Sequence, residues 1–415
     1  MSDRPNDAKR TKVLWLTSSY PRNEDDSASI FLRYLAEALV KQNVDLLILA
    51  PDHSEVQPFR QPPGLVCRHF RYFFPRRLQQ LAYGSGILPN LRAAPWLYLQ
   101  VPFFILSMFV SAAWILLSQR PSLIHAHWIF PQGTVAVLLG KLFRIPTIIT
   151  AHGGDAFALK GKLMGAVKRW TIKNCNSWTS NTKATSVAFG ADLPKPHVIP
   201  MGVDYMRFAS GNREALIGQL TPEKLILLFV GRLVEKKGVA DLLEAYALLP
   251  DTLLAKTELW IIGDGNQAGR LKTMATERRI NHQVVFYGKQ PNNRLPDYYA
   301  AADIFVAPSI IDKVGDTEGQ GVIFLEALAS GLPIIATDVG GIAEIIEHEK
   351  YGLLVKAHNA RALAEAIEIL IINDTLRITL GKNGKIFARA YDWKFIASEL
   401  SLLYLSISNP SEFKS

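Results

Sequence analysis

Residues 318–346 read EGQGVIFLEALASGLPIIATDVGGIAEII, a glycine-containing loop followed by a predicted helix and then a predicted strand. Gly319 and Gly321 stand just before the helix, where glycine lets backbone amides and the helix dipole approach an anion such as phosphate. Glu326, about one turn into the helix, can accept paired hydrogen bonds from ribose hydroxyls, and Glu318 can hold sugar hydroxyls. The alternative is an exposed helical glutamate without a ligand, since two glutamates at this spacing often occur by chance.

Strands alternate with helices on both sides of this segment. Short β-branched or leucine-rich runs predict strands at 12–17, 44–50, 123–127, 146–151, 177–180, 225–230, 258–262, 284–287, 303–307 and 333–337. The later runs are almost continuously apolar, as expected for strands that are buried on both faces of a parallel sheet. The pattern predicts an α/β fold built from doubly wound, Rossmann-like parallel sheets.

The chain of 415 residues is too long for one hydrophobic core, because single cores stop growing at roughly 250–300 residues. Prolines and glycines gather in and beside residues 195–210, which is typical of a domain boundary. We predict one domain over 1–200 and a second over 201–390. Aromatic and leucine positions at helical spacing predict a final helix within 391–415, which can pack across either domain.

Composition excludes several classes of protein. An apolar fraction of 49% with 20% charged residues excludes a disordered chain or a coiled coil. Cys67 and Cys175 match neither a disulfide framework nor a paired zinc motif, so a reducing, cytoplasmic compartment fits best. The apolar run at 13–16 is too short for a signal peptide, and no GxGxxG opens a helix, which disfavours a dinucleotide oxidoreductase.

Positive charge is concentrated in the N-terminal half. Residues 1–200 hold 23 Lys and Arg against 11 Asp and Glu, whereas residues 201–415 hold 23 against 26. Residues 56–154 contain nine basic residues and no acidic one. The positive electrostatic potential of such a segment attracts an anionic partner, and we expect this partner to be an anionic membrane surface rather than nucleic acid.

Residues 96–117, WLYLQVPFFILSMFVSAAWILL, carry no charge over a length that can span a bilayer. A glutamine and a proline interrupt the first third, and a spanning helix would leave the strands at 44–50 and 123–127 on opposite sides of the membrane. A buried helix, or one that dips into a membrane interface, is therefore favoured. Arginines mixed with Phe and Tyr at 68–92 fit such an interface, and a solvated basic face is an equal alternative.

Two further segments carry candidate chemistry. In VGRLVEKKG, residues 230–238, Arg232 offers a bidentate fork and Lys237 a point charge, which suits a diphosphate at the carboxyl edge of a sheet. Such a loop, taken alone, is usually just solvated. In AHGGD, residues 151–155, His152 ends a strand and faces the crevice where ligands of open α/β sheets bind, although a lone histidine is more often structural.

Histidines on the strand at 123–127 raise the question of a metal. His125 and His127 lie on one face of that strand, but no third ligand is near in sequence. We therefore predict no metal site.

These motifs, in this order, resemble the retaining glycosyltransferases of family 4, which have the GT-B fold. The resemblance covers most of the chain. Three further elements share it: Gly340-Gly341, the linker Pro200-Met201-Gly202-Val203-Asp204, and the closing Tyr391-Asp392-Trp393. The resemblance implies two Rossmann-like domains that face a central cleft, with the nucleotide sugar mainly on the second domain and the acceptor on the first.

The resemblance also implies roles for individual residues. Arg232 and Lys237 would bind the donor diphosphate, Glu326 the nucleotide ribose, and Glu318 the donor sugar. His152 would contact the transferred sugar. The other residues implied at the donor are Gly319, Gln320, Gly321, Val322 and Asp155.

The first loop departs from the pattern of the family; it comprises residues 18–31, SSYPRNEDDSASIF. Many relatives carry paired glycines there, and this chain carries none. Contacts from residues 27–29 to donor or acceptor therefore stay unassigned.

We expect retaining transfer from a UDP-, GDP- or ADP-sugar to a hydroxyl acceptor, without a metal and without any cofactor besides the donor. By family analogy the acceptor oxygen attacks from the leaving-group side and the diphosphate takes the proton. The basic, aromatic region 60–117 suggests a lipid-linked glycan acceptor of surface polysaccharide or glycolipid synthesis, at the cytoplasmic face of the inner membrane. An inactive membrane-surface binding protein on the same fold and a sugar-nucleotide epimerase are the alternatives.

Overall fold

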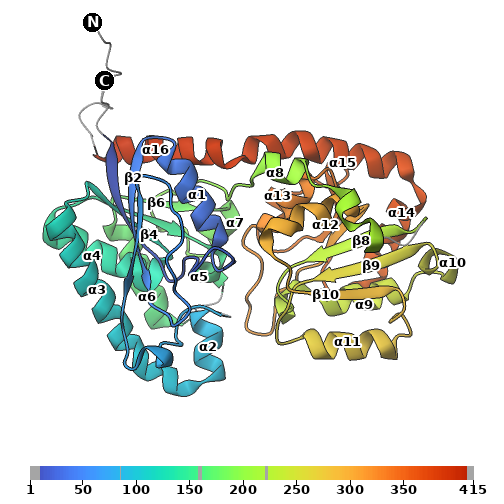
Figure 1. The fold of residues 1–415 in the computed structure, drawn as a ribbon, viewed down its shortest axis with the longest axis horizontal. Helices are drawn as coiled ribbons and strands as arrows, with labels where there is room; N and C mark the ends of the chain where they lie inside the picture. Colours follow the sequence, from blue (N-terminus) through green and yellow to red (C-terminus); the bar gives the residue numbers. More distant parts are fainter. Residues whose placement is uncertain (1–9, 85, 158–160, 220–222, 409–415) are drawn as a thin grey trace, which may run out of the picture.

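The computed structural model describes residues 10–84, 86–157, 161–219 and 223–408. Two parallel sheets with helices packed against them form two lobes that lie side by side (Figure 1). The predicted α/β class with two doubly wound sheets is confirmed. The outer ends of the predicted first domain and final helix, 1–9 and 409–415, lie outside the described residues.

The first sheet has seven parallel strands in the order β3-β2-β1-β4-β5-β6-β7. The strands are β1 (Thr11–Leu16), β2 (Val44–Pro51), β3 (Leu65–Phe70), β4 (Leu123–His127), β5 (Thr147–Ala151), β6 (Ser177–Ser180) and β7 (His197–Val198). β1 pairs with β2 on one side and β4 on the other, so that Trp15 lies opposite Ile48 and His125. The side chains of β4 and β5 are all buried, because helices cover both faces.

The second sheet has six parallel strands in the order β10-β9-β8-β11-β12-β13. The strands are β8 (Leu225–Val230), β9 (Thr257–Ile262), β10 (Val284–Gly288), β11 (Ile304–Ala307), β12 (Ile334–Thr337) and β13 (Gly352–Val355). All ten predicted strands are present with bounds shifted by one residue at most, and β3, β7 and β13 were not predicted.

Helices connect the strands in both domains. Those before the linker are α1 (Ile30–Val40), α2 (Ile87–Ala93), α3 (Gln100–Gln119), α4 (Thr134–Phe143), α5 (Gly153–Phe157), α6 (Lys162–Asn174) and α7 (Lys183–Val187). Those after it are α8 (Tyr205–Ala209), α9 (Val239–Ala247), α10 (Asp251–Leu254), α11 (Ala268–Glu277), α12 (Leu295–Ala301), α13 (Val322–Ala329), α14 (Ala360–Ile372), α15 (Asp374–Ala388) and α16 (Trp393–Ser408).

The strand order places a binding crevice in each domain. In both sheets the order reverses beside the first strand, between β1 and β4 and between β8 and β11. Ligands of open α/β sheets bind outside the carboxyl ends of the strands at such a reversal. The loops that follow these strands therefore position the candidate site.

The final helix belongs to the core of the first domain although its sequence follows the second. Figure 1 shows α16 running back along the top of the molecule to lie beside α1. Where the chain crosses back, the Val203 N–H donates to the Tyr391 carbonyl and the Trp393 N–H donates to the Val203 carbonyl. The buried side of α16 joins the cluster around β1. At its far end Tyr404 accepts a hydrogen bond from the indole of Trp15 at 3.0 Å.

Helix α3 has one buried face and one exposed face. Phe104, Met108 and Ala112 pack toward the sheet and are almost fully buried. The opposite side, which we call the α3 face, carries five large apolar side chains that are 54% to 65% exposed: Phe103, Leu106, Val110, Trp114 and Leu117. By length and composition the stretch Pro95–Gln119 could cross a membrane. It lies against a sheet in which β2, β1 and β4 are contiguous, so it does not separate their strands.

Candidate active site

Loops from the two domains touch beside the carboxyl ends of the sheets. A Cβ atom on Gly319 would lie 2.8 Å from the Cα of Gly153, which leaves room only for glycine at either position. The hydroxyl of Thr182 also lies 3.3 Å from the carbonyl oxygen of Gly319. The structure therefore brings the two predicted motifs, AHGGD and EGQG, face to face.

Cationic side chains from the loop after β8 surround Glu318. Lys237 forms an ion pair with Glu318, and Lys236 pairs with Asp316 at 3.0 Å. Burial alone would raise the pKa of Glu318, but the charges of Lys237, Lys236 and Arg232 outweigh burial and hold that pKa below its ordinary value. Glu318 is ionised, and Arg232, Lys237 and Glu318 lie together as the sequence predicts.

Glu326 lies on α13 and is bound by a tyrosine from α12. The buried Tyr299 donates its hydroxyl to Oε2 of Glu326 at 2.8 Å. Burial raises the pKa of Glu326, and the Tyr299 hydrogen bond and the charge of Arg207 oppose that rise only in part. The other carboxylate oxygen has no hydrogen-bond partner among the described residues and is left for a ligand. Sequence reasoning missed Tyr299, whose segment looks like any apolar helix.

The glycine loop before α13 is fixed by close backbone contacts. Gly321 is the N-cap residue of the helix with φ of 76°, and Val322 is the first helical residue. Gly340, with φ of 59°, approaches so closely that a Cβ would lie 1.9 Å from the carbonyl oxygen of Glu318. These contacts hold the amides at the start of α13 in one place.

The side chain of Gln320 turns toward the linker and away from the predicted sugar site. Its Oε1 accepts a hydrogen bond from the Met201 N–H at 2.7 Å, and its Nε2 donates to the Met201 carbonyl at 3.1 Å. The side chain is buried, and each of its polar atoms makes one hydrogen bond to Met201. Gln320 therefore joins the glycine loop before α13 to the crossing between domains.

Glu344 makes a second contact across the domain boundary. Its two carboxylate oxygens accept hydrogen bonds of 2.7 Å from the backbone N–H groups of Lys183 and Ala184 at the start of α7. Sequence reasoning missed this contact, because nothing near Glu344 indicates a partner about 160 residues away.

His152 lies at the end of β5 between aromatic rings. The rings of Phe31 and Trp128 are 5.5 and 4.8 Å from it between centroids. Its Nε2 lies 3.3 Å from Nδ1 of His127. Burial lowers the pKa of His152 to about 3, so the ring is neutral near pH 7 and can donate one hydrogen bond.

The carboxylate of Asp155 is bound by backbone N–H groups of the first domain. Its Oδ1 accepts from the N–H of Ile129 and its Oδ2 from the N–H of His152, both at 3.0 Å. Burial raises the pKa of this carboxyl to about 7 against the effect of those two hydrogen bonds. Asp155 therefore fixes the backbone that carries His152, and its placement differs from the donor contact that the resemblance implies.

His125 has a structural place in the core. Its Nδ1 lies 2.6 Å from the Tyr404 hydroxyl and its Nε2 lies 2.7 Å from the Thr150 hydroxyl, so both ring nitrogens are occupied. In the described part of the chain, no group of three or more His, Cys, Asp or Glu side chains could hold a metal ion.

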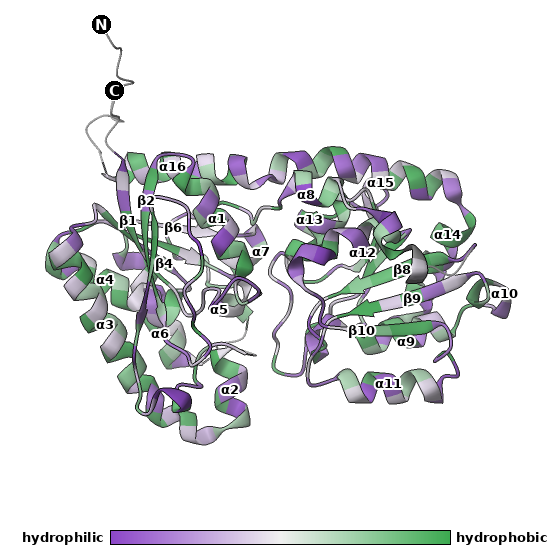
Figure 2. Cartoon of the chain, in the orientation of Figure 1, coloured by the Kyte–Doolittle hydropathy of each residue, from purple (hydrophilic) through white to green (hydrophobic). Residues whose placement is uncertain are grey.

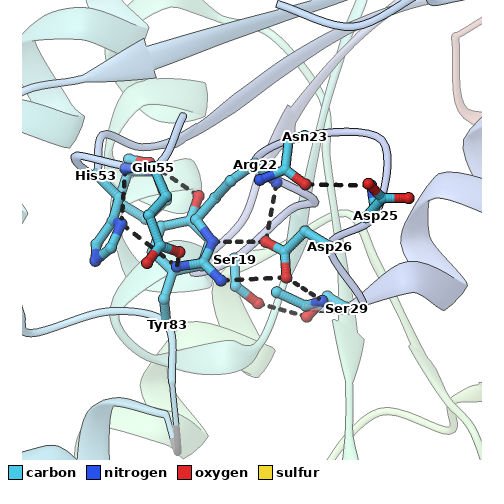
Figure 3. Close-up of polar contacts among 11 residues, drawn as sticks. Ser19, Arg22, Asn23, Asp25, Asp26, Ser29, His53, Glu55 and Tyr83 are labelled. Atoms are coloured by element: carbon cyan, nitrogen blue, oxygen red, sulfur yellow. Dashed lines mark hydrogen bonds and ion pairs between the residues drawn. The ribbon is translucent and has the colours of Figure 1, made fainter. Parts of the chain in front are cut away.

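Ion pairs order the glycine-free loop between β1 and α1, which is drawn in Figure 3. Arg22 binds Asp26 through two nitrogens, at 2.6 and 3.2 Å, and Glu55 at 2.6 Å. Its guanidinium also lies 5.0 Å from the centre of the Tyr83 ring. Ser29, at the start of α1, has φ of 47°, a conformation that glycine adopts more easily. Side-chain contacts therefore order this loop, which contains no glycine.

Comparisons with known proteins agree with this geometry. Residues 28–207 match the family model described as Glycosyltransferase Family 4, and residues 213–387 match that of Glycosyl transferases group 1. The chain is 31% identical over 373 residues to a Bacillus subtilis (strain 168) protein described as a teichuronic acid biosynthesis glycosyltransferase, TuaC. That match covers 86% of this chain and 88% of the relative.

Solved structures share the fold. Sucrose-phosphate synthase from Thermosynechococcus elongatus superposes with a TM-score of 0.78 at 22% identity, over 97% of this chain and all of the other. Anabaena HepE, solved in complex with UDP-glucose, superposes with a TM-score of 0.71 at 19% identity, over 96% of this chain and all of the other.

Proposed function

Since the chain belongs to glycosyltransferase family 4 and has the GT-B fold, we propose that it transfers a sugar from a nucleotide diphosphate sugar to an acceptor hydroxyl with retention at the anomeric carbon. One observation carries the proposal. The Lys237–Glu318 pair of the second domain stands beside Gly319, whose backbone touches Gly153 next to His152, at the carboxyl ends of both sheets. A donor bound there places its reacting carbon between the domains.

The cations of the second domain would stabilise the leaving group. Arg232 and Lys237 meet a diphosphate whose charge grows as the glycosidic bond breaks, and one such preorganised contact is worth about 3–4 kcal/mol in the transition state. Lys237 is held in place by Glu318 until a donor competes for it. Glu326, with one oxygen fixed by Tyr299, offers the other to a ribose hydroxyl.

Retention without a covalent intermediate is consistent with the carboxylates on the first-domain side. Asp155, the acidic residue nearest to His152 in sequence, is engaged by two backbone N–H groups and is not poised as a nucleophile. We therefore propose attack of the acceptor oxygen from the leaving-group side, with the diphosphate taking the proton. The positive side chains near Glu318 take the place of a divalent ion, so the proposed reaction needs no metal.

The acceptor, we propose, is a lipid-linked glycan that reaches the enzyme from a membrane surface. The α3 face is a stripe with residues three or four apart, which puts five large apolar side chains on one side of a helix. Hydrophobic colouring runs along α3 and α4 at the outer edge of the first domain (Figure 2). Such a stripe exposed on one domain suits insertion into the headgroup boundary of a bilayer.

Basic side chains border the α3 face, although fewer are free than the sequence suggests. Arg68 lies over the Trp114 ring at 5.3 Å, and Arg71 is 75% exposed although its Nε lies 3.3 Å from Oδ2 of Asp52. Arg76 instead forms two hydrogen bonds, at 2.9 and 2.8 Å, with the buried Asp52. Charge reversal is therefore better tested at the exposed Arg77 than at Arg76, whose loss would leave Asp52 without its main partner.

The relatives favour glycosyl transfer over the two alternatives. TuaC is described as a glycosyltransferase of teichuronic acid synthesis, and other relatives as D-inositol 3-phosphate glycosyltransferases. Anabaena HepE is described with UDP-glucose bound. A sugar-nucleotide donor and a polysaccharide or glycolipid product are the natural proposals for this chain.

A donor screen tests the proposal. UDP-, GDP- and ADP-sugars are each added to the purified chain, starting with UDP-glucose, and the melting temperature is followed. A ligand at 100 times its dissociation constant stabilises the folded state by about 2.7 kcal/mol, so a true donor raises the melting temperature. Glu326→Gln serves as the matched control and should reduce that rise. If no nucleotide sugar is bound or consumed, the proposed function is wrong.

A further inference from the structure

Two buried histidines from neighbouring strands share one hydrogen bond beneath the cleft. His127 ends β4, His152 follows β5, and Nδ1 of His127 lies 3.3 Å from Nε2 of His152. The two rings are nearly parallel, with 25° between their planes. A neutral imidazole has one N–H and one lone pair, so one ring donates this bond and the other accepts it.

The surroundings of His127 decide which ring donates. Its Nε2 is buried and has no hydrogen-bond partner among the described residues. Oδ1 of Asn181 lines the same small cavity but does not bond it. A buried N–H without a partner is rarer and more costly than an unused lone pair, so Nε2 carries the lone pair and Nδ1 the proton.

We propose that His127 is a positioning residue that donates its Nδ1–H to Nε2 of His152 and thereby fixes His152 with its own proton on Nδ1. That Nδ1 has no partner in the described part of the chain and, unlike Nε2 of His127, is not sealed from solvent. His152 then presents a neutral N–H donor to the cleft. This inference rests on the proposed function only where it assigns that donor to an oxygen of the transferred sugar.

Packing keeps His127 in the orientation that this role requires. The Trp15 ring meets it edge-on at 4.4 Å, and the His125 ring lies 4.4 Å away on the same strand. His125 is itself fixed by hydrogen bonds to Tyr404 and Thr150. Burial and the neighbouring imidazoles of His125 and His152 lower the pKa of His127, so it remains a neutral donor near pH 7.

The direct test is the tautomer of His152 in the whole protein. Histidine is labelled with nitrogen-15, long-range proton–nitrogen correlations are recorded at pH 7, and a His152→Asn spectrum identifies the signals that disappear. The expected result is a protonated Nδ1 and an unprotonated Nε2. A protonated Nε2 on His152 in the wild-type chain would overturn the inference, whether or not the chain turns over any sugar.

Substitutions at His127 separate positioning from packing. In His127→Asn an amide N–H can replace the Nδ1–H. His152 should therefore keep its tautomer, and the variant should retain most of the wild-type activity. In His127→Gln the amide is carried one carbon further, toward the position of Nε2, and His127→Phe has no donor. In both variants we expect the His152 ring to populate both neutral tautomers. We also expect kcat to fall about tenfold, which corresponds to the loss of one net hydrogen bond, with little change in affinity for the nucleotide.

The outcomes of this series distinguish the two proposals. If His127→Gln and His127→Phe leave the His152 tautomer unchanged, His127 does not position it. If the wild-type tautomer is as expected but no nucleotide sugar is turned over, the proposed function fails and the positioning of His152 stands. Should the phenylalanine variant not fold, the wild-type spectrum and the Asn and Gln pair still decide the question.

Discussion

Replacing Leu106 and Val110 by serine should detach the chain from membranes without unfolding it. Both side chains belong to the α3 face and are 61% and 57% exposed, so they contribute little to the core. Moving a whole aliphatic side chain of this size out of water is worth about 1.5–3 kcal/mol. Scaled by the exposed fractions, the pair contributes about 2–3.5 kcal/mol, which predicts roughly 30- to 400-fold weaker binding.

Sedimentation with vesicles that contain anionic lipid measures this loss, at low and at high salt. Each Lys or Arg near an anionic surface contributes about 1 kcal/mol, and salt screens that part. The apolar part survives salt, so wild-type binding should fall but not vanish as salt rises. The double variant should lose the salt-resistant part, whereas Arg77→Glu should mainly weaken binding at low salt.

The matched control is a pair of equally exposed apolar side chains on the second domain. Ile372 on α14 and Ile386 on α15 are each 66% exposed. Their replacement by serine should leave vesicle binding as in wild type. Wild-type binding by the Leu106→Ser/Val110→Ser chain, or an equal loss in the control, would refute the assignment of the α3 face as a membrane surface.

Three further predictions concern the donor site. Tyr299→Phe removes a hydrogen bond that opposes the raised pKa of Glu326, so that pKa should rise further, and as pH falls the donor KM should begin to increase at a higher pH than in wild type; identical pH profiles would exclude this role. Lys237→Ala should lower kcat about 100- to 1000-fold and should also raise the pKa of Glu318, and a wild-type kcat would remove the diphosphate assignment. Turnover should survive EDTA, and complete loss that manganese restores would show that a metal neutralises the diphosphate.

Much of the fold could be predicted because buried parallel strands have a strong local pattern. Runs such as 225–230 and 333–337 are apolar at nearly every position, since both faces of the sheet are covered. β3 at Leu65–Phe70 was missed because it is an edge strand that carries Arg68 and His69. β13 at Gly352–Val355 was also missed; it is the edge strand of the second sheet, and only its first two residues are buried.

The residues of the candidate site could be predicted from the sequence only where they directly follow a strand. Arg232, Lys237 and Glu318 each follow a strand of the second sheet, so the sequence places them at one edge. The positions of Gln320, Asp155 and Tyr299 depend on contacts with distant segments, namely Met201, the backbone of Ile129, and α13. No local pattern encodes such contacts.

The central claim, retaining transfer from a nucleotide sugar, is tested most directly by the anomeric configuration of the first product. The donor found in the screen is incubated with the chain and a hydroxyl acceptor, and proton NMR of the isolated glycoside gives the configuration of its new linkage, which does not mutarotate. The account predicts that the new glycosidic bond has the same anomeric configuration as the donor. A product of inverted configuration, or donor that is consumed without any glycoside being formed, would contradict it.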